Sequence, residues 1–131
     1  MKYLPYYYEG TLYTPSGCGI ENPAILITKS DIFCVYGDAE AVKKEFDRRC
    51  EAYSKIGFQE EIDDLVLIEF NKYGAFNTED IAYIILRMML YTATGFVKNF
   101  YNYLQSSPDA LVSWIQSEKQ RIPINVRGGV S

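Results

Sequence analysis

Residues 77–106, NTEDIAYIILRMMLYTATGFVKNFYNYLQS, decide how the rest of the chain can pack. Asn77 is a favourable N-cap and two acids follow it, so the sequence predicts one long helix over the whole stretch. From 81 to 90 the residues are apolar almost all the way round, apart from Arg87. A helix with one wet side would be more amphipathic. We therefore expect burial on most sides, at the centre of a small domain or partly in a subunit interface.

The totals describe an ordinary globular protein with many aromatic residues. Of its 131 residues, 48% are apolar, 23% charged and 15% aromatic, with 12 Tyr leading. Such a chain is large enough for a core of its own and too apolar to be disordered. Tyr suits a core, an interface or a stacking surface. We expect one domain over residues 1–131, of which residues 122–131 form a flexible basic tail.

Catalytic and metal chemistry have little support in the composition. The chain has no His, which removes the commonest metal ligand and the commonest general base at neutral pH. Cys18, Cys34 and Cys50 lack CxxC spacing, and an odd thiol count without a signal peptide indicates an intracellular protein. We predict no enzyme, no catalytic residue, no metal and no cofactor, with Cys34 and Cys50 in the core. A central Arg87 also argues against a membrane span.

The other segments predict an α+β fold in which a small, mainly antiparallel sheet packs against three helices, one of them long and very apolar. β-branched and aromatic residues indicate strands at 24–29, 31–36 and 65–71. Residues 1–8 suit an edge strand, because Pro5 cannot donate to a central ladder. A strand places successive side chains on opposite faces. At least one of the three tyrosines Tyr6, Tyr7 and Tyr8 is therefore expected to face solvent, a partner or a ligand.

Two further helices and an acidic loop complete the expected fold. A helix is expected from 37 or 38 to about 56, with an apolar stripe of Val42, Phe46, Cys50, Tyr53 and Ile56. Residues 59–64, QEEIDD, are expected to be a solvated acidic loop. A last helix is expected to begin after a cap at Ser106 or Ser107, with Pro108 in its first turn, and to end near 120.

The charges are segregated along the chain, although the net charge is −4. Residues 31–80 hold 13 acids and 6 bases, a net −7, whereas residues 81–131 hold 2 acids and 5 bases, a net +3. Cations bind phosphates and aromatic rings stack on unpaired bases, so the C-terminal part suits single-stranded nucleic acid. The candidate phosphate contacts are Lys98, Lys119, Arg121 and Arg127, the candidate stacking residues are Tyr101 and Tyr103, and weaker candidates are Arg48 and Arg49.

The segments MKYLPYYYEG, IAYIILRMMLYTATGF and RIPINVRGGVS together resemble a small protein family encoded by rod-shaped viruses of hyperthermophilic archaea. The resemblance implies a homodimer that binds single-stranded DNA without sequence preference and without an OB fold. It also implies a role in viral DNA replication or recombination inside the host cell, beside a virus-encoded nuclease and an annealing protein as partners.

Two other functions remain open at this point. One is a non-enzymatic viral structural or protein-interaction protein, whose exposed tyrosines meet another protein. The other is an enzyme built on a cleft of coupled carboxylates, formed by residues 60–64 with Glu69. A metal-dependent nuclease core of Asp64 and Glu69 with Lys72 is one form of it. The spacing from Glu69 to Lys72 is one residue too long for both to lie on one face of a strand, which counts against the nuclease.

Overall fold

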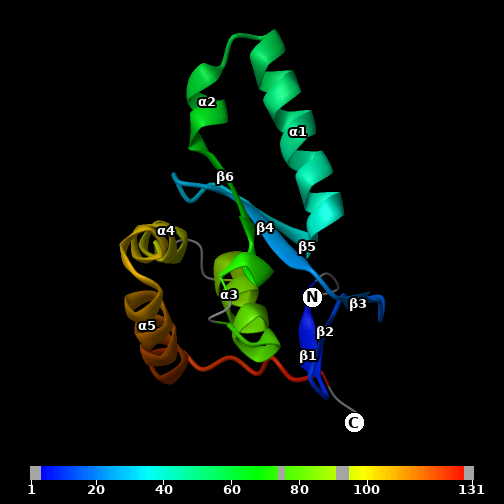
Figure 1. Cartoon of the computed structure of the whole chain (residues 1–131), viewed down its shortest axis with the longest axis vertical. Coiled ribbons are helices and arrows are strands. Elements are labelled where there is room, and N and C mark those ends of the chain that lie inside the picture. Colours follow the sequence, from blue (N-terminus) through cyan, green and yellow to red (C-terminus); the bar gives the residue numbers. More distant parts are fainter. Residues whose placement is uncertain (1–3, 74–75, 91–94, 129–131) are drawn as a thin grey trace.

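The α+β class is confirmed by the computed structural model, which describes residues 4–73, 76–90 and 95–128 (Figure 1). Its strands form two three-stranded antiparallel sheets instead of one. The first sheet has the order β1-β2-β3 and the second has the order β5-β4-β6. The strands are β1 (Tyr6–Tyr8), β2 (Thr11–Tyr13), β3 (Gly19–Ile20), β4 (Pro23–Thr28), β5 (Cys34–Asp38) and β6 (Leu65–Glu69).

The described residues contain five α-helices and a 3-10 turn, more than the three helices expected. They are α1 (Ala39–Lys55), α2 (Gln59–Asp64), the turn η1 (Phe70–Lys72), α3 (Thr78–Leu90), α4 (Phe96–Ser106) and α5 (Pro108–Arg121). The boundaries of α1 and α5 agree with the sequence prediction, and the Ser107 hydroxyl accepts from Ala110 N at 3.1 Å. The expected acidic loop is wrong, because residues 59–64 form the helix α2.

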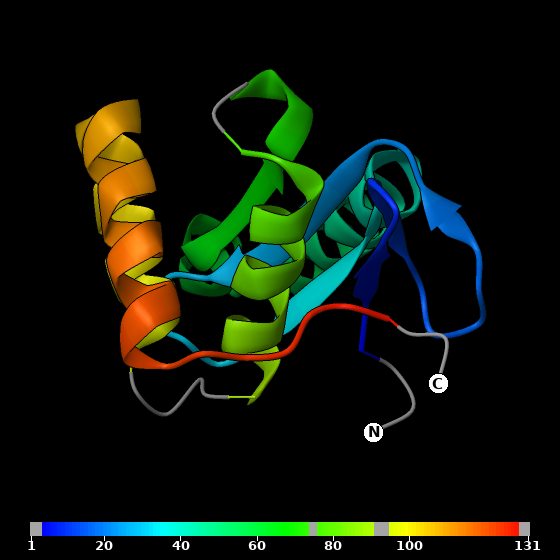
Figure 2. The same ribbon diagram turned by 90° about the horizontal axis from the view of Figure 1, so that it is seen from below.

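β4 is the centre of the molecule, and its six residues are all buried. Leu26 faces the cluster that α1 covers, whereas Ile25 and Ile27 face the cluster that contains α3, α4 and α5. The sheet therefore has helices on both faces (Figures 1 and 2). This explains why the strand has no polar alternation. The stripe expected on α1 packs on this sheet except for Ile56, which is 60% exposed.

The prediction of one helix over residues 77–106 is wrong. The start is as expected: the Asn77 side chain caps α3 by accepting a hydrogen bond from Asp80 N at 2.8 Å. However, α3 ends at Leu90, and α4 begins after Gly95, whose φ of 76° is left-handed. A right-handed helix cannot pass through that conformation; residues 91–94 lie outside the described residues. The core half and the surface half of the predicted helix are thus two separate helices.

The C-terminal segment packs against the first sheet instead of forming a flexible tail over residues 122–128. It runs past α3 to β1, where Tyr7 N donates to Val126 O at 2.7 Å and Gly128 N donates to Tyr7 O at 2.9 Å (Figure 2). A Cβ on Gly128 would lie 2.0 Å from a Tyr6 ring carbon, so the ring requires glycine there. The segment covers the edge of β1, as an edge strand requires. Residues 129–131 lie outside the described residues.

The tyrosines of β1 and the cysteines are mostly half-buried. Tyr6 stacks on Tyr13 of β2 with ring centroids 5.3 Å apart, and Tyr7 packs against the main core. Cys34 and Cys50 were predicted to lie in the core; they are partly buried, and each packs against one of the two cores. Burial raises the pKa of the Cys34 thiol to about 12. Cys18 is exposed. Among the described residues, no helix has both the length and the apolar character that crossing a membrane requires.

Candidate nucleic-acid interface

The sheet separates two of the predicted contacts from the others. Arg48 and Arg49 lie on α1, which covers the face of the sheet opposite to α3 and α4 (Figure 1). Both donate to Glu45 at 2.6 Å. The Arg48 guanidinium, followed by that of Arg49, lowers the pKa of Glu45 to about 2. Arg49 also lies 4.2 Å from the centroid of the Phe33 ring. These two arginines are thus paired within their own surface.

The three predicted cations of α5 and the C-terminal segment also meet carboxylates. Lys119 Nζ lies 2.7 Å from Asp80 Oδ1. Arg121 Nη2 lies 2.7 Å from Glu118 Oε1. Arg127 Nε lies 3.0 Å from Glu79 Oε2. Two of these three acids belong to the first turn of α3. Lys119 and Arg127 therefore join α5 and the C-terminal segment to α3, whereas Arg121 pairs within α5 itself.

A buried ion pair lies at the centre of this region. Arg87 has no solvent-exposed surface, and its Nη1 donates to Glu118 Oε1 at 2.8 Å and to the Tyr83 hydroxyl at 3.1 Å. The Tyr83 hydroxyl lies 2.7 Å from Glu118 O and 2.6 Å from Ile122 O, at the end of α5. Hydrogen bonds from Arg121 and Arg87 lower the pKa of Glu118 despite its burial. Arg87, the one charged residue in the apolar part of α3, therefore holds α5 against α3 through Glu118.

The sequence did hold a signal for this pair. An arginine inside an apolar helix requires a carboxylate partner, because an unpaired charge is costly to bury. Residues 81–131 contain two acids, Asp109 and Glu118, and Asp109 lies in the first turn of α5, where it suits the helix dipole. Of the two acids that follow Arg87 in the chain, Glu118 was thus the better candidate for its partner, and sequence analysis missed it.

The exposed face of α4 differs from these regions because no acid lies on the helix. Residues 95–107 contain no Asp or Glu. Lys98, Asn99 and Asn102 are exposed. Tyr101 and Tyr103 are two positions apart, or about 200° around the axis, so they lie at opposite rims of this face. Among the described residues, no carboxylate lies within ion-pair distance of Lys98.

Lys29, in the turn between β4 and β5, extends this face at the Tyr101 rim and was missed by sequence analysis. Its Nζ lies 5.4 Å from the centroid of the Tyr101 ring. Gln105 Nε2 donates to the Tyr101 hydroxyl at 2.5 Å, which fixes the ring further. Asp31 of the same turn is the nearby acid: burial raises its pKa, and the positive charge of Lys98 opposes that shift. The turn thus adds one lysine and a partly buried carboxyl group to the site.

At the opposite rim, Tyr103 is the end of a stack of rings between α4 and α5. Tyr103 lies on Trp114 with centroids 5.0 Å apart, and Trp114 lies on Phe96 at 4.9 Å. The guanidinium carbon of Arg87 is 4.4 Å from the centroid of the Phe96 ring. Tyr103 is 37% exposed. One face of the Tyr103 ring is thus covered by Trp114, and part of the residue stays accessible to solvent.

We call this face the α4 surface. It consists of Lys29, Lys98, Asn99, Tyr101, Asn102, Tyr103 and Gln105. Lysines bind phosphate oxygens, amides donate and accept hydrogen bonds, and rings stack on bases. Of the eight residues predicted from sequence, the structure brings together three here, namely Lys98, Tyr101 and Tyr103.

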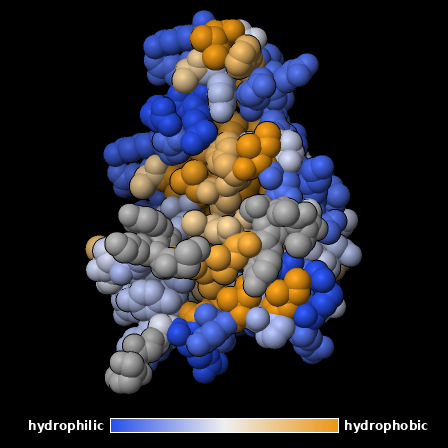
Figure 3. Space-filling view, turned by 180° about the vertical axis from the view of Figure 1, so that it is seen from behind, coloured by the Kyte–Doolittle hydropathy of each residue, from blue (hydrophilic) through white to orange (hydrophobic). Residues whose placement is uncertain are grey.

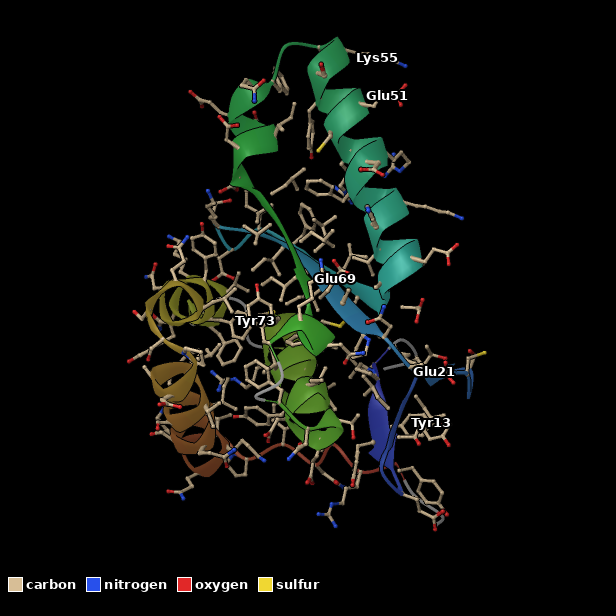
Figure 4. The ribbon with its side chains drawn as sticks, viewed as in Figure 1. Tyr13, Glu21, Glu51, Lys55, Glu69 and Tyr73 are labelled. Carbon is tan, nitrogen blue, oxygen red and sulfur yellow. The ribbon has the colours of Figure 1, made fainter. Side chains whose placement is uncertain are left out.

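The three residues of the nuclease alternative already have partners, and two of them pair with each other. Ser30 Oγ donates to Asp64 Oδ2 at 2.6 Å. Lys72 Nζ lies 2.8 Å from Glu69 Oε2, at the end of β6 (Figure 4). Within the part of the chain that the structure describes, no three His, Cys, Asp or Glu side chains are grouped to hold a metal ion. In the described residues, the carboxylates of the nuclease alternative are thus engaged within the fold, whereas the polar side chains of the α4 surface remain exposed.

No family model, no curated protein and no solved structure matches this chain.

Proposed function

We propose that this protein binds single-stranded DNA without sequence preference and that it does so at the α4 surface. The observation that carries the proposal is a helix face free of acids, with a tyrosine at each rim and two lysines outside any ion pair with the described carboxylates. Such a face binds phosphates through Lys29 and Lys98 and bases through Tyr101 and Tyr103.

The proposal includes a homodimer, because two lysines make a small electrostatic site. A second copy doubles the number of phosphate contacts, and each contact adds to the affinity. The apolar helix α3 is unavailable as an interface, since its residues 80–88 are buried within the chain. β5 remains as an edge of the second sheet, and apolar side chains form a band on the rear face of the molecule (Figure 3). The role in viral DNA replication or recombination is adopted from the resemblance alone.

The first test is fluorescence anisotropy of labelled oligo-dT and of the corresponding duplex, titrated with the full chain at two salt concentrations. The proposal predicts tighter binding of the single strand, and an affinity that falls as salt rises because counterions are released on binding. Equal binding of both forms, or no binding to either, contradicts it. Light scattering on the same sample measures the mass, which is expected to be twice 15.1 kDa.

The second candidate is a protein-interaction protein without affinity for DNA. It is favoured by the ion pairs that occupy five of the six predicted cations. Exposed apolar side chains, among them Ile32 at 75%, also favour it. It predicts no change in oligonucleotide anisotropy at any salt concentration.

A further inference from the structure

The two helices α1 and α2 form an arm that projects beyond the sheet, away from α3, α4 and α5 (Figure 1). α1 has 17 residues, which at 1.5 Å per residue gives a length of about 25 Å. Glu51 and Lys55 mark the far end of α1 (Figure 4). We call this end of the arm the arm tip; it consists of the turn at residues 56–58 and the first three residues of α2, 59–61. None of the functions derived above uses it.

The arm tip exposes two large apolar side chains. Ile56 is 60% exposed and Phe58 is 49% exposed. Ile56 completes the apolar stripe of α1, but it lies beyond the part of that helix that packs on the sheet. α2 has six residues, too few to bury the end of α1. Clustered exposed apolar residues of this size mark a contact site more often than scattered ones.

The backbone holds these side chains in a fixed position. Phe58 N donates to Tyr53 O at 2.9 Å, and Gly57 N donates to Ser54 O at 3.2 Å. With Gly57 at a φ of 77°, these bonds form a Schellman cap that ends α1. A side chain presented from a fixed turn loses less conformational entropy on binding than one on a mobile loop. The tip is therefore preorganised for a contact.

The charges beside the two apolar side chains are negative. Glu60 and Glu61 are exposed, and among the described residues no cation lies within ion-pair distance of either. The one lysine nearby, Lys55, is paired with Glu51 at 3.2 Å. Glu60 and Glu61 line a shallow hollow together with Phe58. In Figure 3, apolar surface at the same end of the molecule is bordered by hydrophilic residues.

We propose that the arm tip docks against a helix of a protein partner that has an apolar face bordered by lysines or arginines. Ile56 and Phe58 pack on the apolar face, while Glu60 and Glu61 face the basic border. Carboxylates repel nucleic acid and anionic membranes, so neither fits this tip. A second copy of this chain fits poorly, since the lysines of its α4 surface lie beside tyrosines and amides instead of an apolar face. This docking function is independent of DNA binding at the α4 surface.

The test uses the full ¹⁵N-labelled chain and three helical probe peptides, with amide shifts recorded by NMR. One peptide has a leucine face and a lysine face, the second replaces leucine by serine, and the third replaces lysine by glutamate. The proposal predicts that the first peptide alone binds and that the shifted amides lie at residues 56–61. Equal binding of the serine peptide, shifts confined to other residues, or no binding at about 1 mM peptide overturns it.

Three variants separate the apolar and electrostatic contributions. The double change Ile56→Ser with Phe58→Ser is expected to raise the Kd of the first peptide at least about tenfold. Glu60→Gln with Glu61→Gln is expected to weaken binding and remove most of its salt dependence. Ile32→Ser, on an isoleucine outside the arm that is more exposed than Ile56, is the matched control and is expected to leave Kd unchanged. An unchanged Kd in the first variant overturns the proposal.

Two measurements on the same variants identify other occupants of the tip. Sedimentation shows whether the Ile56→Ser, Phe58→Ser protein has lost self-association, which would assign the tip to a second copy and overturn the proposal. Oligo-dT anisotropy is expected to be unchanged in this variant. If the parent chain binds oligo-dT but does not bind the first peptide, the docking function alone is contradicted. If it binds the peptide but not oligo-dT, DNA binding alone is contradicted, so the two proposals fail separately.

Discussion

The α4 surface and the region formed by α5 with residues 122–128 are similar in sequence but different in structure. Both carry cations among aromatic or apolar residues, and both were predicted to contact phosphates. On α5 and beyond it, Lys119, Arg121 and Arg127 each meet a carboxylate. On α4, Lys98 has no carboxylate within ion-pair distance among the described residues, although its charge still acts on the nearby Asp31. Whether a cation can bind a ligand depends on which acids the fold places beside it. Its neighbours in sequence do not show this.

The difference has a physical cause in α3. The acids at its start suit the helix dipole, and Arg87 lies in its middle. Asp80 is 4% exposed and Arg87 is fully buried, so each requires a partner of opposite charge. α5 supplies both partners, Lys119 and Glu118. Because α4 packs through Phe96, Val97 and Phe100, its polar face is left for other contacts.

The largest expected effect concerns the buried ion pair. Glu118→Gln leaves the Arg87 charge buried without a carboxylate, which is expected to cost about 3–5 kcal/mol of unfolding free energy. Urea unfolding measures the loss. Asp109→Asn, an exposed acid on the same helix, is the control and is expected to change stability by less than about 0.5 kcal/mol. A similar small change for Glu118→Gln would mean that the pair does not anchor α5.

The same pair predicts how stability depends on pH. Hydrogen bonds from Arg121, and then from Arg87, hold the pKa of Glu118 below its ordinary value of 4.5 in the folded chain. A depressed pKa means that the unfolded chain binds the proton more tightly, so this contribution is complete above pH 4.5 and is lost as pH falls through the lower folded value. Unfolding curves recorded across this range are expected to show a smaller slope with pH for Glu118→Gln than for the parent chain.

Next in size is the packing of the C-terminal segment on β1. Gly128→Ala places a Cβ 2.0 Å from the Tyr6 ring, and such overpacking is expected to cost about 1–3 kcal/mol. Hydrogen exchange of the Tyr7 amide, which is bonded to Val126, is expected to accelerate. Gly19→Ala is the control, because its Cβ would meet its nearest atom at 3.7 Å. Equal effects of the two changes would contradict a segment held by this contact.

The comparison between the two regions is tested most directly with double variants of their cations. Lys29→Ala with Lys98→Ala is expected to raise the Kd for oligo-dT about tenfold and to lower the log–log salt slope by about 1.4, or about 0.7 per lost phosphate contact. Arg121→Ala with Arg127→Ala is expected to reduce stability while leaving the slope unchanged, since both residues pair within the fold.

The control for this pair of variants lies on the other side of the sheet. Lys43→Ala with Lys44→Ala removes the same charge from exposed positions of α1 and is expected to change neither Kd nor slope beyond experimental error. If the arginine variant lowers the slope and the Lys29, Lys98 variant does not, the binding surface is formed by α5 and the C-terminal segment instead.

The smallest expected effect is that of a single stacking ring. Tyr101→Leu is expected to cost about 1 kcal/mol of binding free energy, at the low end for a stacked base because Lys29 already lies over this ring. Anisotropy with oligo-dT measures the change. Tyr73→Leu, at a 42% exposed tyrosine that is not part of the α4 surface, is the control. Equal losses for both would remove Tyr101 from the site.

The part of the candidate site that was predictable lies on one element. Lys98, Tyr101 and Tyr103 were found because they share a short segment without acids, and a local pattern is visible in sequence. Lys29 was missed because it reaches Tyr101 from the turn after β4, far away in the chain. The pairing of Lys119, Arg121 and Arg127 was missed because two of their acids lie on α3. Contacts between distant segments leave no local signal.

Elements with local causes could be predicted from the sequence alone. Caps and apolar periodicity predicted α1 and α5, the Asn77 cap predicted the start of α3, and β-branched residues predicted β4. Three outcomes depended on tertiary packing: where the predicted long helix divides, which cations are neutralised and where residues 122–128 pack. Each of these outcomes depends on a surface that exists only after distant segments have packed, such as the Tyr6 ring over Gly128 or the Arg87 charge beneath α5.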